Sequence, residues 1–299
     1  MSVEKSPSTG RAYGIERASS ALAVMRSSFF ERKRRNPAER SKSKKRGPVP
    51  SVSDKKLLAL IKEDLGASAF IGEGYRKVSA RLKFGRGIAD SRKRMLRLMR
   101  ENNLLSSNRQ PQMPLNERDG QITTSEPSMW GSDGARVFTR FEGWGWIFVN
   151  MEHWNAECMG WHATKKGDRF AALEPVAMGV MSVYGSVERD VASGLSLRMD
   201  HGTQYPSDHL QSQIEAWSIV KSVAFLERFR ANGVAERFLR TLQGQVIYGR
   251  VFDTIEEVRQ AIADFGERYN NEWLLENNGY LSPPQARVAY YEREMEAVA

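Results

Sequence analysis

The sequence contains a single cysteine, Cys158, among its 299 residues. One thiol excludes an intrachain disulfide and any zinc site built on paired Cys-x-x-Cys ligands. No uninterrupted apolar stretch approaches the ~18 residues of a membrane-spanning helix. The polar opening, residues 1–11, lacks the apolar region of a secretory signal. These absences predict an intracellular protein with no membrane association.

Apolar residues are nevertheless plentiful. They make up 40% of the chain, and aromatic residues make up 10%, including seven Trp. This composition excludes a disordered chain and is sufficient for at least one sizeable core. The length allows two domains, or one domain with appendages.

The charge is distributed unevenly along the chain. Residues 1–110 carry 27 Lys and Arg against 10 Asp and Glu, whereas residues 111–299 carry 18 against 26. A basic front predicts a module that binds a polyanion, and nucleic acid is the obvious one. The acidic remainder needs a reason for its carboxylates if it also approaches nucleic acid, and metal binding is one. The alternatives are a ribosome-associated chain or a merely solubilised one.

The basic front divides into three parts. We expect an N-terminal helical segment (1–35), a basic linker rich in Ser, Pro and Gly (36–53), and a compact all-α region (54–105). The linker can lie along a phosphate backbone, or it is a solvated tether with no partner.

The all-α region shows three helical stripes separated by Gly turns, and Ser53 and either Asp90 or Ser91 are candidate N-caps. This pattern predicts a helix-turn-helix whose last helix enters a DNA groove. A plain three-helix bundle with a charged outer face is the alternative. The candidate DNA-binding cations of this region are Arg76, Lys77, Arg92, Lys93, Arg94, Arg97 and Arg100.

After a Pro-punctuated linker (106–128), the pattern changes to strands. The order is three strands, then helix, strand, helix, strand and helix, which predicts an α/β fold with a mixed sheet and helices on both faces. We place this core at 129–249 and a helical tail at 250–299. The expected elements are strands 129–139, 144–151 and 157–163, helix 168–184, strand 195–200, helix 208–217, strand 219–224 and helix 233–246.

Three carboxylates of this core are candidate catalytic and metal-binding residues: Asp133, Asp200 and Glu236. They cannot share a site without a cation, because like charges raise each other's pKa. Oxygen ligands of this kind select Mg²⁺ or Mn²⁺, and two such ions suit phosphoryl transfer. The 35 residues between Asp200 and Glu236 are not specific by themselves, since Asp90 and Glu126 show the same gap.

Several longer motifs resemble, in order, those of OrfB-type transposases of bacterial insertion sequences. The motifs of the core are Met129-Trp-Gly-Ser-Asp133-Gly, Glu152-His-Trp-Asn-Ala-Glu-Cys-Met-Gly-Trp161, Met199-Asp200-His-Gly-Thr-Gln-Tyr205 and Asn232-Gly-Val-Ala-Glu236-Arg-Phe. The basic region adds Gly72-x-Gly-Tyr-Arg76 with Arg94-Met-Leu-Arg-Leu-Met-Arg-Glu-Asn102, and the tail adds Tyr269-Asn270 with Gly279-Tyr-Leu-Ser-Pro283. The resemblance spans nearly the whole chain.

The resemblance implies a ribonuclease-H-like core in which Asp133, Asp200 and Glu236 form the DDE metal site and bind, in all, two Mg²⁺ or Mn²⁺ ions. It implies cleavage of double-stranded DNA at terminal inverted repeats and transfer of the 3′-OH to a target DNA. Many relatives carry Lys seven residues after the Glu, where this chain has Gln243. Arg240, one turn after Glu236, retains a cation on that face and joins the DNA-binding candidates.

The same resemblance implies a homo-multimer, an OrfA partner and a cytoplasmic, nucleoid-associated location in bacteria. Two alternatives stay open. One is a catalytically decayed DNA-binding remnant that recognises element ends and acts as a regulator or inhibitor. The other is a host nuclease that cleaves RNA–DNA hybrids with the same sheet.

Overall fold

The structure, a computed structural model, describes residues 5–34, 50, 52–106, 124–199, 204–223 and 232–298. The chain forms two units, residues 1–51 and 52–299, which are described separately. Within the described residues, no helix combines the length and apolar character needed to cross a membrane.

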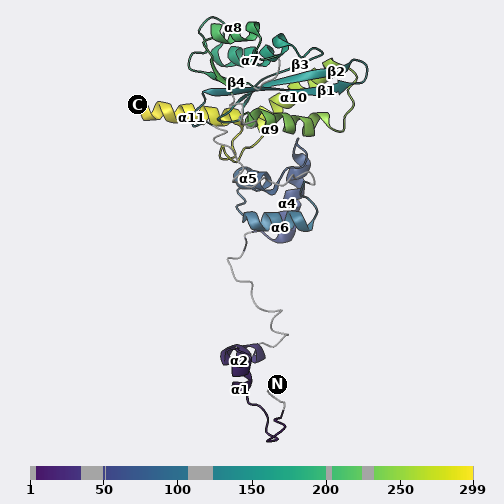
Figure 1. The fold of residues 1–299 in the computed structure, drawn as a ribbon, viewed down its shortest axis with the longest axis vertical. Helices are drawn as coiled ribbons and strands as arrows, with labels where there is room; N and C mark the ends of the chain where they lie inside the picture. Colours follow the sequence, from purple (N-terminus) through teal and green to yellow (C-terminus); the bar gives the residue numbers. More distant parts are fainter. Residues whose placement is uncertain are drawn as a thin grey trace. The chain divides into compact units, whose positions relative to one another are not determined.

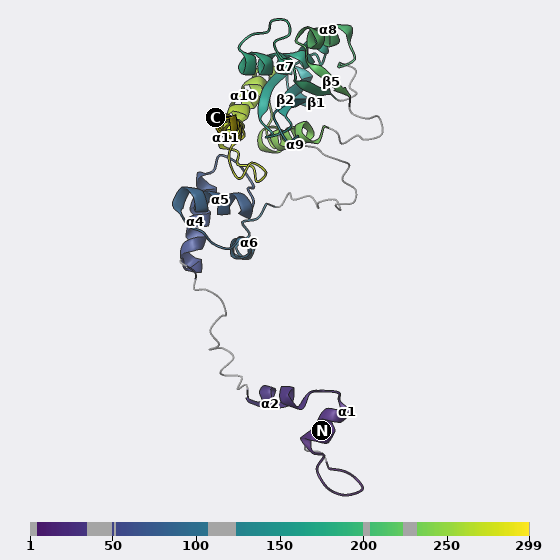
Figure 2. The ribbon, with the colours of Figure 1, turned by 90° about the vertical axis from the view of Figure 1, so that its left-hand side faces the viewer.

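The first unit contains two short helices, α1 (Ile15–Ala21) and α2 (Arg26–Arg34) (Figure 2). The N-terminal helical segment expected within residues 1–35 therefore consists of two helices rather than one. Ala23 adopts a positive φ of 52°, which interrupts the helix between the two. Apolar residues near the break, such as Val24 and Met25, are exposed, so they form no core here.

The second unit begins with three helices, α4 (Asp54–Ala67), α5 (Tyr75–Arg86) and α6 (Arg92–Glu101). The side chains of Ser53 and Ser91 accept hydrogen bonds from the first turns of α4 and α6, as their positions predicted. One buried cluster joins the three helices: Leu57, Ile61, Val78, Leu82, Met95, Leu98 and Met99.

A five-stranded sheet follows, with the strand order β3-β2-β1-β4-β5. Strands β1, β2 and β3 form an antiparallel meander, whereas β4 pairs in parallel with both β1 and β5. The mixed sheet predicted from the element order is confirmed. The strands are β1 (Met129–Thr139), β2 (Gly143–Glu152), β3 (Cys158–Thr164), β4 (Ser196–Met199) and β5 (Val220–Val223).

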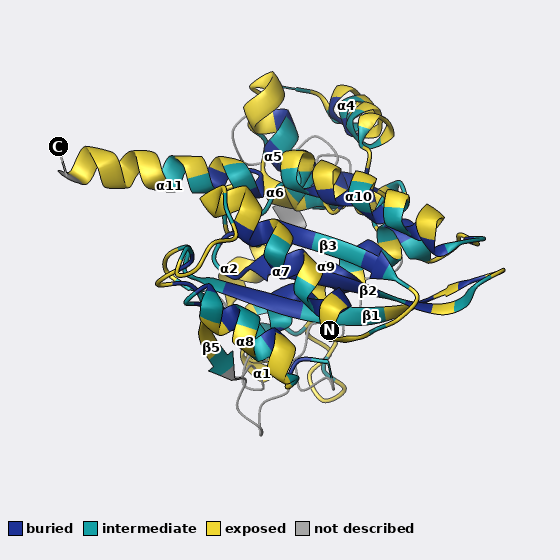
Figure 3. Cartoon of the chain, turned by 90° about the horizontal axis from the view of Figure 1, so that it is seen from above, coloured by how far each residue is buried: buried dark blue, intermediate teal, exposed yellow. Residues whose placement is uncertain are grey.

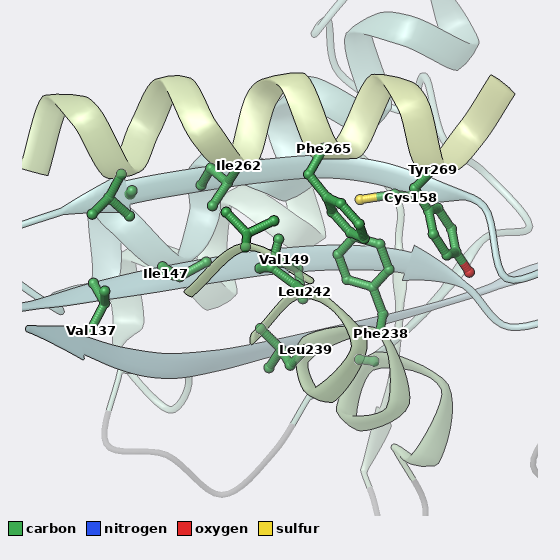
Figure 4. Packing of buried hydrophobic residues seen from close by; sticks show 14 of the residues in the cluster. Val137, Ile147, Val149, Cys158, Phe238, Leu239, Leu242, Ile262, Phe265 and Tyr269 are labelled. Carbon is green, nitrogen blue, oxygen red and sulfur yellow. The ribbon is translucent and has the colours of Figure 1, made fainter. Parts of the chain in front are cut away.

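Helices cover both faces of this sheet (Figure 1). One face packs against α7 (Arg169–Tyr184) and α8 (Asp208–Ala216). The other packs against α9 (Gly233–Leu242) and α10 (Ile255–Glu272), where Phe238 and Phe265 meet above the strands (Figure 4). The strands are mostly buried between these layers, while the distal half of α11 (Pro283–Val298) is exposed (Figure 3).

The helix predicted over 233–246 ends earlier, at Leu242, and continues as a π-helix, Gln243–Ile247. In this segment the Gln245 side chain hydrogen-bonds the backbone of Ile71, which lies between α4 and α5. The amide accepts from Ile71 N at 3.0 Å and donates to Ile71 O at 2.8 Å. The turn after α9 therefore contacts the three-helix region.

Candidate metal and DNA site

Asp133 lies in the middle of β1, and the strand's alternation defines the face on which it projects. Trp130 belongs to the cluster under α7, whereas Val137 belongs to the cluster under α9 and α10. Because side chains alternate along a strand, Asp133 projects on the same face as Val137. It is half-buried, and its Oδ1 accepts from the Gly134 amide at 2.7 Å. The carboxylate is therefore on the α9 side of the sheet.

Asn232, the residue before α9, ties this helix to β1. Its Nδ2 donates to the backbone oxygen of Ser132 at 2.8 Å, one residue before Asp133. Its Oδ1 lies 3.4 Å from Nε2 of the buried His153. The sequence motif that contains Asn232 did not identify it as a site residue. An Asn directly before a helix could have indicated such a role, because its side chain commonly bonds backbone groups at a helix start.

Glu236 lies in the first turn of α9, four residues after Asn232, and its amide donates to Asn232 O at 3.1 Å. Residues four apart lie on one helix face. Asn232 is buried against β1, and Glu236 is half-buried on the same side of the helix. The structure therefore places Asp133 and Glu236 on the same face of the sheet.

The contact between β1 and the start of α9 is close. A Cβ added at Gly131 would lie 2.3 Å from Asn232 Oδ1 and 2.4 Å from His153 Nε2. A larger residue at Gly131 would have to displace the side chains of Asn232 and His153. The glycine thus permits the approach that brings Glu236 toward the strand bearing Asp133.

Asp200 lies outside the described residues, but both flanks of its segment are described. Met199 pairs with Ser132 in the parallel ladder. On the other side, the Tyr205 hydroxyl lies 3.2 Å from Ser132 Oγ. Among the residues that the structure describes, no group of three His, Cys, Asp or Glu side chains is placed to hold a metal ion.

Glu152, which lies in the strand next to β1, has a raised pKa. Glu152, at the end of β2 opposite Trp130, is buried, and burial raises its pKa from 4.5 to about 7. Its Oε1 accepts from the Trp154 amide at 3.1 Å. It lies on the α7 face, opposite to Asp133, because alternate β2 residues such as Val149 lie under α9 and α10.

This burial predicts a pH-dependent stability. Between pH 4.5 and 7 the folded protein retains a proton on Glu152 that the unfolded chain has released, so the free energy of unfolding falls as pH rises through this window. The loss amounts to about 3 kcal/mol, and Glu152→Gln should remove it and be the more stable form at pH 8. Urea unfolding from pH 4 to 8 measures this. Exposed Glu188→Gln is the control, and an unchanged slope in Glu152→Gln would contradict the assignment.

The cations predicted to bind DNA differ in their surroundings. Arg94 is only 12% exposed, and its guanidinium bonds Asp54, Asp90 and the Val52 carbonyl oxygen. These contacts join the N-terminal end of α4 to α6. In this structure Arg94 therefore stabilises the three-helix region rather than facing a groove.

Lys77 is also enclosed. Its Nζ lies 3.0 Å from the centroid of the Trp273 ring and 3.5 Å from Glu73, and burial lowers its pKa to about 7. Such a lysine packs between the helical region and the core.

Other candidates are at the surface. Arg97 pairs with Asp54 and Glu101 there, whereas Arg76 and Arg92 both pair with Glu276. Lys93, Arg100 and Arg240 are exposed as well.

We expect Arg94→Ala and Lys93→Ala to separate these two roles. Removing Arg94 leaves the Asp90 carboxylate without its guanidinium and Asp54 with Arg97 alone, so the thermal midpoint should fall by roughly 4–8 °C. Removing exposed Lys93 should leave that midpoint unchanged but reduce the salt dependence of DNA binding by about one phosphate contact. Calorimetry and binding titrations measure the two effects. The reverse pattern would mean that Arg94 faces DNA.

The strand order and the two helical layers define the class of this domain: a ribonuclease-H-like α/β fold, preceded here by a helical bundle. A family model described as "Integrase core domain" matches residues 227–283, which include Glu236. The transposase InsF of insertion sequence IS3A from Escherichia coli K12 is 24% identical over 157 residues. The chain is thus similar to insertion-sequence transposases over about half its length, with distant homology, and its residues 227–283 match the integrase core model.

The matched region covers 52% of this chain and 52% of InsF, so the chain spans about half the length of this relative. The transposase of element IS904 from Lactococcus lactis is 23% identical over 54% of this chain and 61% of the relative. Among solved structures, the catalytic core domain of BIV integrase is 16% identical over 58% of this chain and all of that one, with a TM-score of 0.38. The HTLV-2 integrase catalytic core in complex with magnesium is 14% identical over 54% and 95%, with a TM-score of 0.36.

Proposed function

We propose that this protein is a DDE transposase that cleaves DNA at the ends of an insertion sequence and joins the 3′ ends to a target. The observation that carries the proposal is the attachment of α9 to β1 through Asn232. It holds Glu236 on the face from which Asp133 projects. The distant homology to insertion-sequence transposases supports the same activity.

Asp200 would complete the site. Met199, the last described residue before it, pairs with Ser132, the residue before Asp133, in the parallel ladder of β4 and β1. Tyr205, beyond the segment, also reaches Ser132. The described residues on both sides of the segment that contains Asp200 thus contact Ser132, the neighbour of Asp133, which supports the assignment of Asp200 to this site.

The donor set fits divalent magnesium or manganese. Carboxylates from a strand and a helix supply hard oxygen ligands, and two ions held by Asp133, Asp200 and Glu236 would, when bound, activate the attacking oxygen and stabilise the leaving one. Asp133 and Glu236 are both half-buried, so a bound cation would offset the reduced solvation of their carboxylates. The chain's own contribution is to fix these oxygens through the buried amide of Asn232.

The remaining parts follow from this role. We propose that residues 54–105 form the DNA-binding domain and that Lys93 and Arg100 contact DNA from it. Arg240 would contact DNA from the catalytic core at 129–249. Exposed cations suit phosphates. Joining two element ends to one target requires a homo-multimer, and an OrfA protein is a further proposed partner.

The experiment uses the full chain, Mg²⁺ and a duplex containing the inverted repeats that flank its gene. Wild type should nick the repeat end and yield joined products, and EDTA should abolish both. Asp200→Asn should reduce nicking by roughly 10²-fold or more. Asp208→Asn, an exposed residue of α8, serves as the matched control. Equal nicking by wild type and Asp200→Asn would contradict the proposal, and binding without nicking by wild type would favour a DNA-binding remnant.

A further inference from the structure

A cleft of about 700 Å³ separates the first turn of α5 from the end of α9. Tyr75 and Arg76 line it from α5, whereas Arg240 and Gln245 line it from α9 and the π-helix that follows. The helical region and the ribonuclease-H-like core thus contribute one wall each. Arg240 lies one helical turn beyond Glu236.

The two walls are held together by contacts that do not involve Arg76 or Arg240. Phe70, in the loop before α5, is buried in the hydrophobic cluster of the core, and its ring centroid lies 4.7 Å from that of Trp273. The Gln245 amide makes both of its hydrogen bonds to Ile71 within the same region. The cleft is therefore a built feature of the fold, with an apolar anchor beside it.

Two exposed guanidinium groups supply the positive charge of the cleft. Arg76 and Arg240 are exposed on opposite walls, and Lys77 lies deeper, against Trp273. Of the nearby carboxylates, Glu73 is buried and paired with Lys77 and Arg81. The other, Glu276, pairs with Arg76 at 2.6 Å.

We propose that this cleft binds the phosphodiester backbone of a DNA strand, held between Arg76 and Arg240. This inference rests on the proposed function, since both take DNA as the ligand. A strand bound there would pass directly from the helical region to the helix that carries Glu236. The DNA phosphate replaces the Glu276 carboxylate at Arg76, so Glu276 is an internal competitor for the site.

Because Glu276 competes with DNA, replacing Arg76 and replacing Glu276 should change the DNA affinity in opposite directions. Arg76→Gln and Glu276→Gln both break the Arg76–Glu276 ion pair, and Glu276→Gln also breaks the pair with Arg92, so any loosening of the cleft would be at least as large in Glu276→Gln. Loss of a phosphate contact weakens DNA binding only in Arg76→Gln. Loss of the competitor strengthens binding in Glu276→Gln.

The experiment measures fluorescence anisotropy of a labelled 30-bp random-sequence duplex with the full chain in EDTA, from 50 to 300 mM KCl. Arg76→Gln and Arg240→Gln should each weaken binding roughly 3- to 10-fold and reduce the slope of log K against log salt by about 1. Glu276→Gln should tighten binding a few-fold. Arg76→Lys should restore most of the affinity, because it restores the charge. Arg293→Gln, on exposed α11, is the control.

The inference is overturned if Arg76→Gln and Arg240→Gln behave like Arg293→Gln, or if Glu276→Gln weakens binding as Arg76→Gln does. These results would leave the proposed cleavage and joining activity intact, because wild type would still bind DNA, and would remove only Arg240 from the proposed DNA contacts. Failure of wild type to bind the duplex at 50 mM KCl would overturn both. Metal-dependent nicking plays no part in this assay, so the two proposals fail separately.

Discussion

Replacing Glu236 by Gln is expected to lower Mg²⁺-dependent DNA cleavage by roughly 10²–10⁴-fold. The amide keeps the size of the side chain but loses the negative charge that a divalent cation requires. Because Glu236 is half-buried in the first turn of α9, the substitution should not disturb the packing of that helix. Single-turnover cleavage of the repeat end measures the effect.

DNA affinity in EDTA provides the internal control, since it should be unchanged in Glu236→Gln. Exposed Glu267→Gln on α10 is the matched variant and should cleave like wild type. If Glu236→Gln cleaves at the wild-type rate, Glu236 does not hold the metal. If it loses DNA affinity together with cleavage, its carboxylate has a structural role instead.

The second large effect is expected at Asn232. Asn232→Ala removes the donor to Ser132 O and leaves a buried carbonyl oxygen and His153 with one partner fewer. The free energy of unfolding should fall by about 1–3 kcal/mol. Cleavage should fall by roughly 10–100-fold at temperatures where the variant is fully folded, since Glu236 loses its alignment with Asp133.

Asn271→Ala, an exposed residue of α10, is the control for Asn232→Ala. The positioning role is separated from a purely structural one by titrating Mg²⁺ in the cleavage assay. A displaced Glu236 should raise the Mg²⁺ concentration needed for half-maximal rate, whereas partial unfolding would only reduce the active fraction. An unchanged metal requirement would show that Asn232 does not align the carboxylates.

Much of the fold could be predicted because local signals agree with it. Ser53 and Ser91 cap helices where a short hydroxyl precedes an apolar stripe, since that side chain accepts from free amides at a helix start. The change of pattern after the linker at 106–128 predicted the strand that carries Asp133. The sequence does not predict the break at Ala23, because alanine favours helices and rarely adopts the positive φ found there.

The cations show where sequence reasoning stopped. Arg94 and Lys93 are adjacent and chemically alike, and charge alone assigned both to DNA. Arg94 instead meets Asp54, forty residues earlier in the chain, and Lys77 meets Trp273. Partners so distant in sequence come together only when the helices pack. The pattern of charges along the sequence therefore could not distinguish cations that are buried and paired from cations that are exposed.

By itself, the sequence determined which acids were candidates, the order of strands and helices, and the separation of a basic region from an acidic one. Tertiary structure decided which of those acids share a face. The physical reason is that side chains alternate between the two faces of a strand and rotate around a helix. Which side chains face each other therefore depends on the strand register and on how the helix packs against the sheet. At this site both depend on one buried amide and on a glycine, Gly131, small enough to let the helix approach.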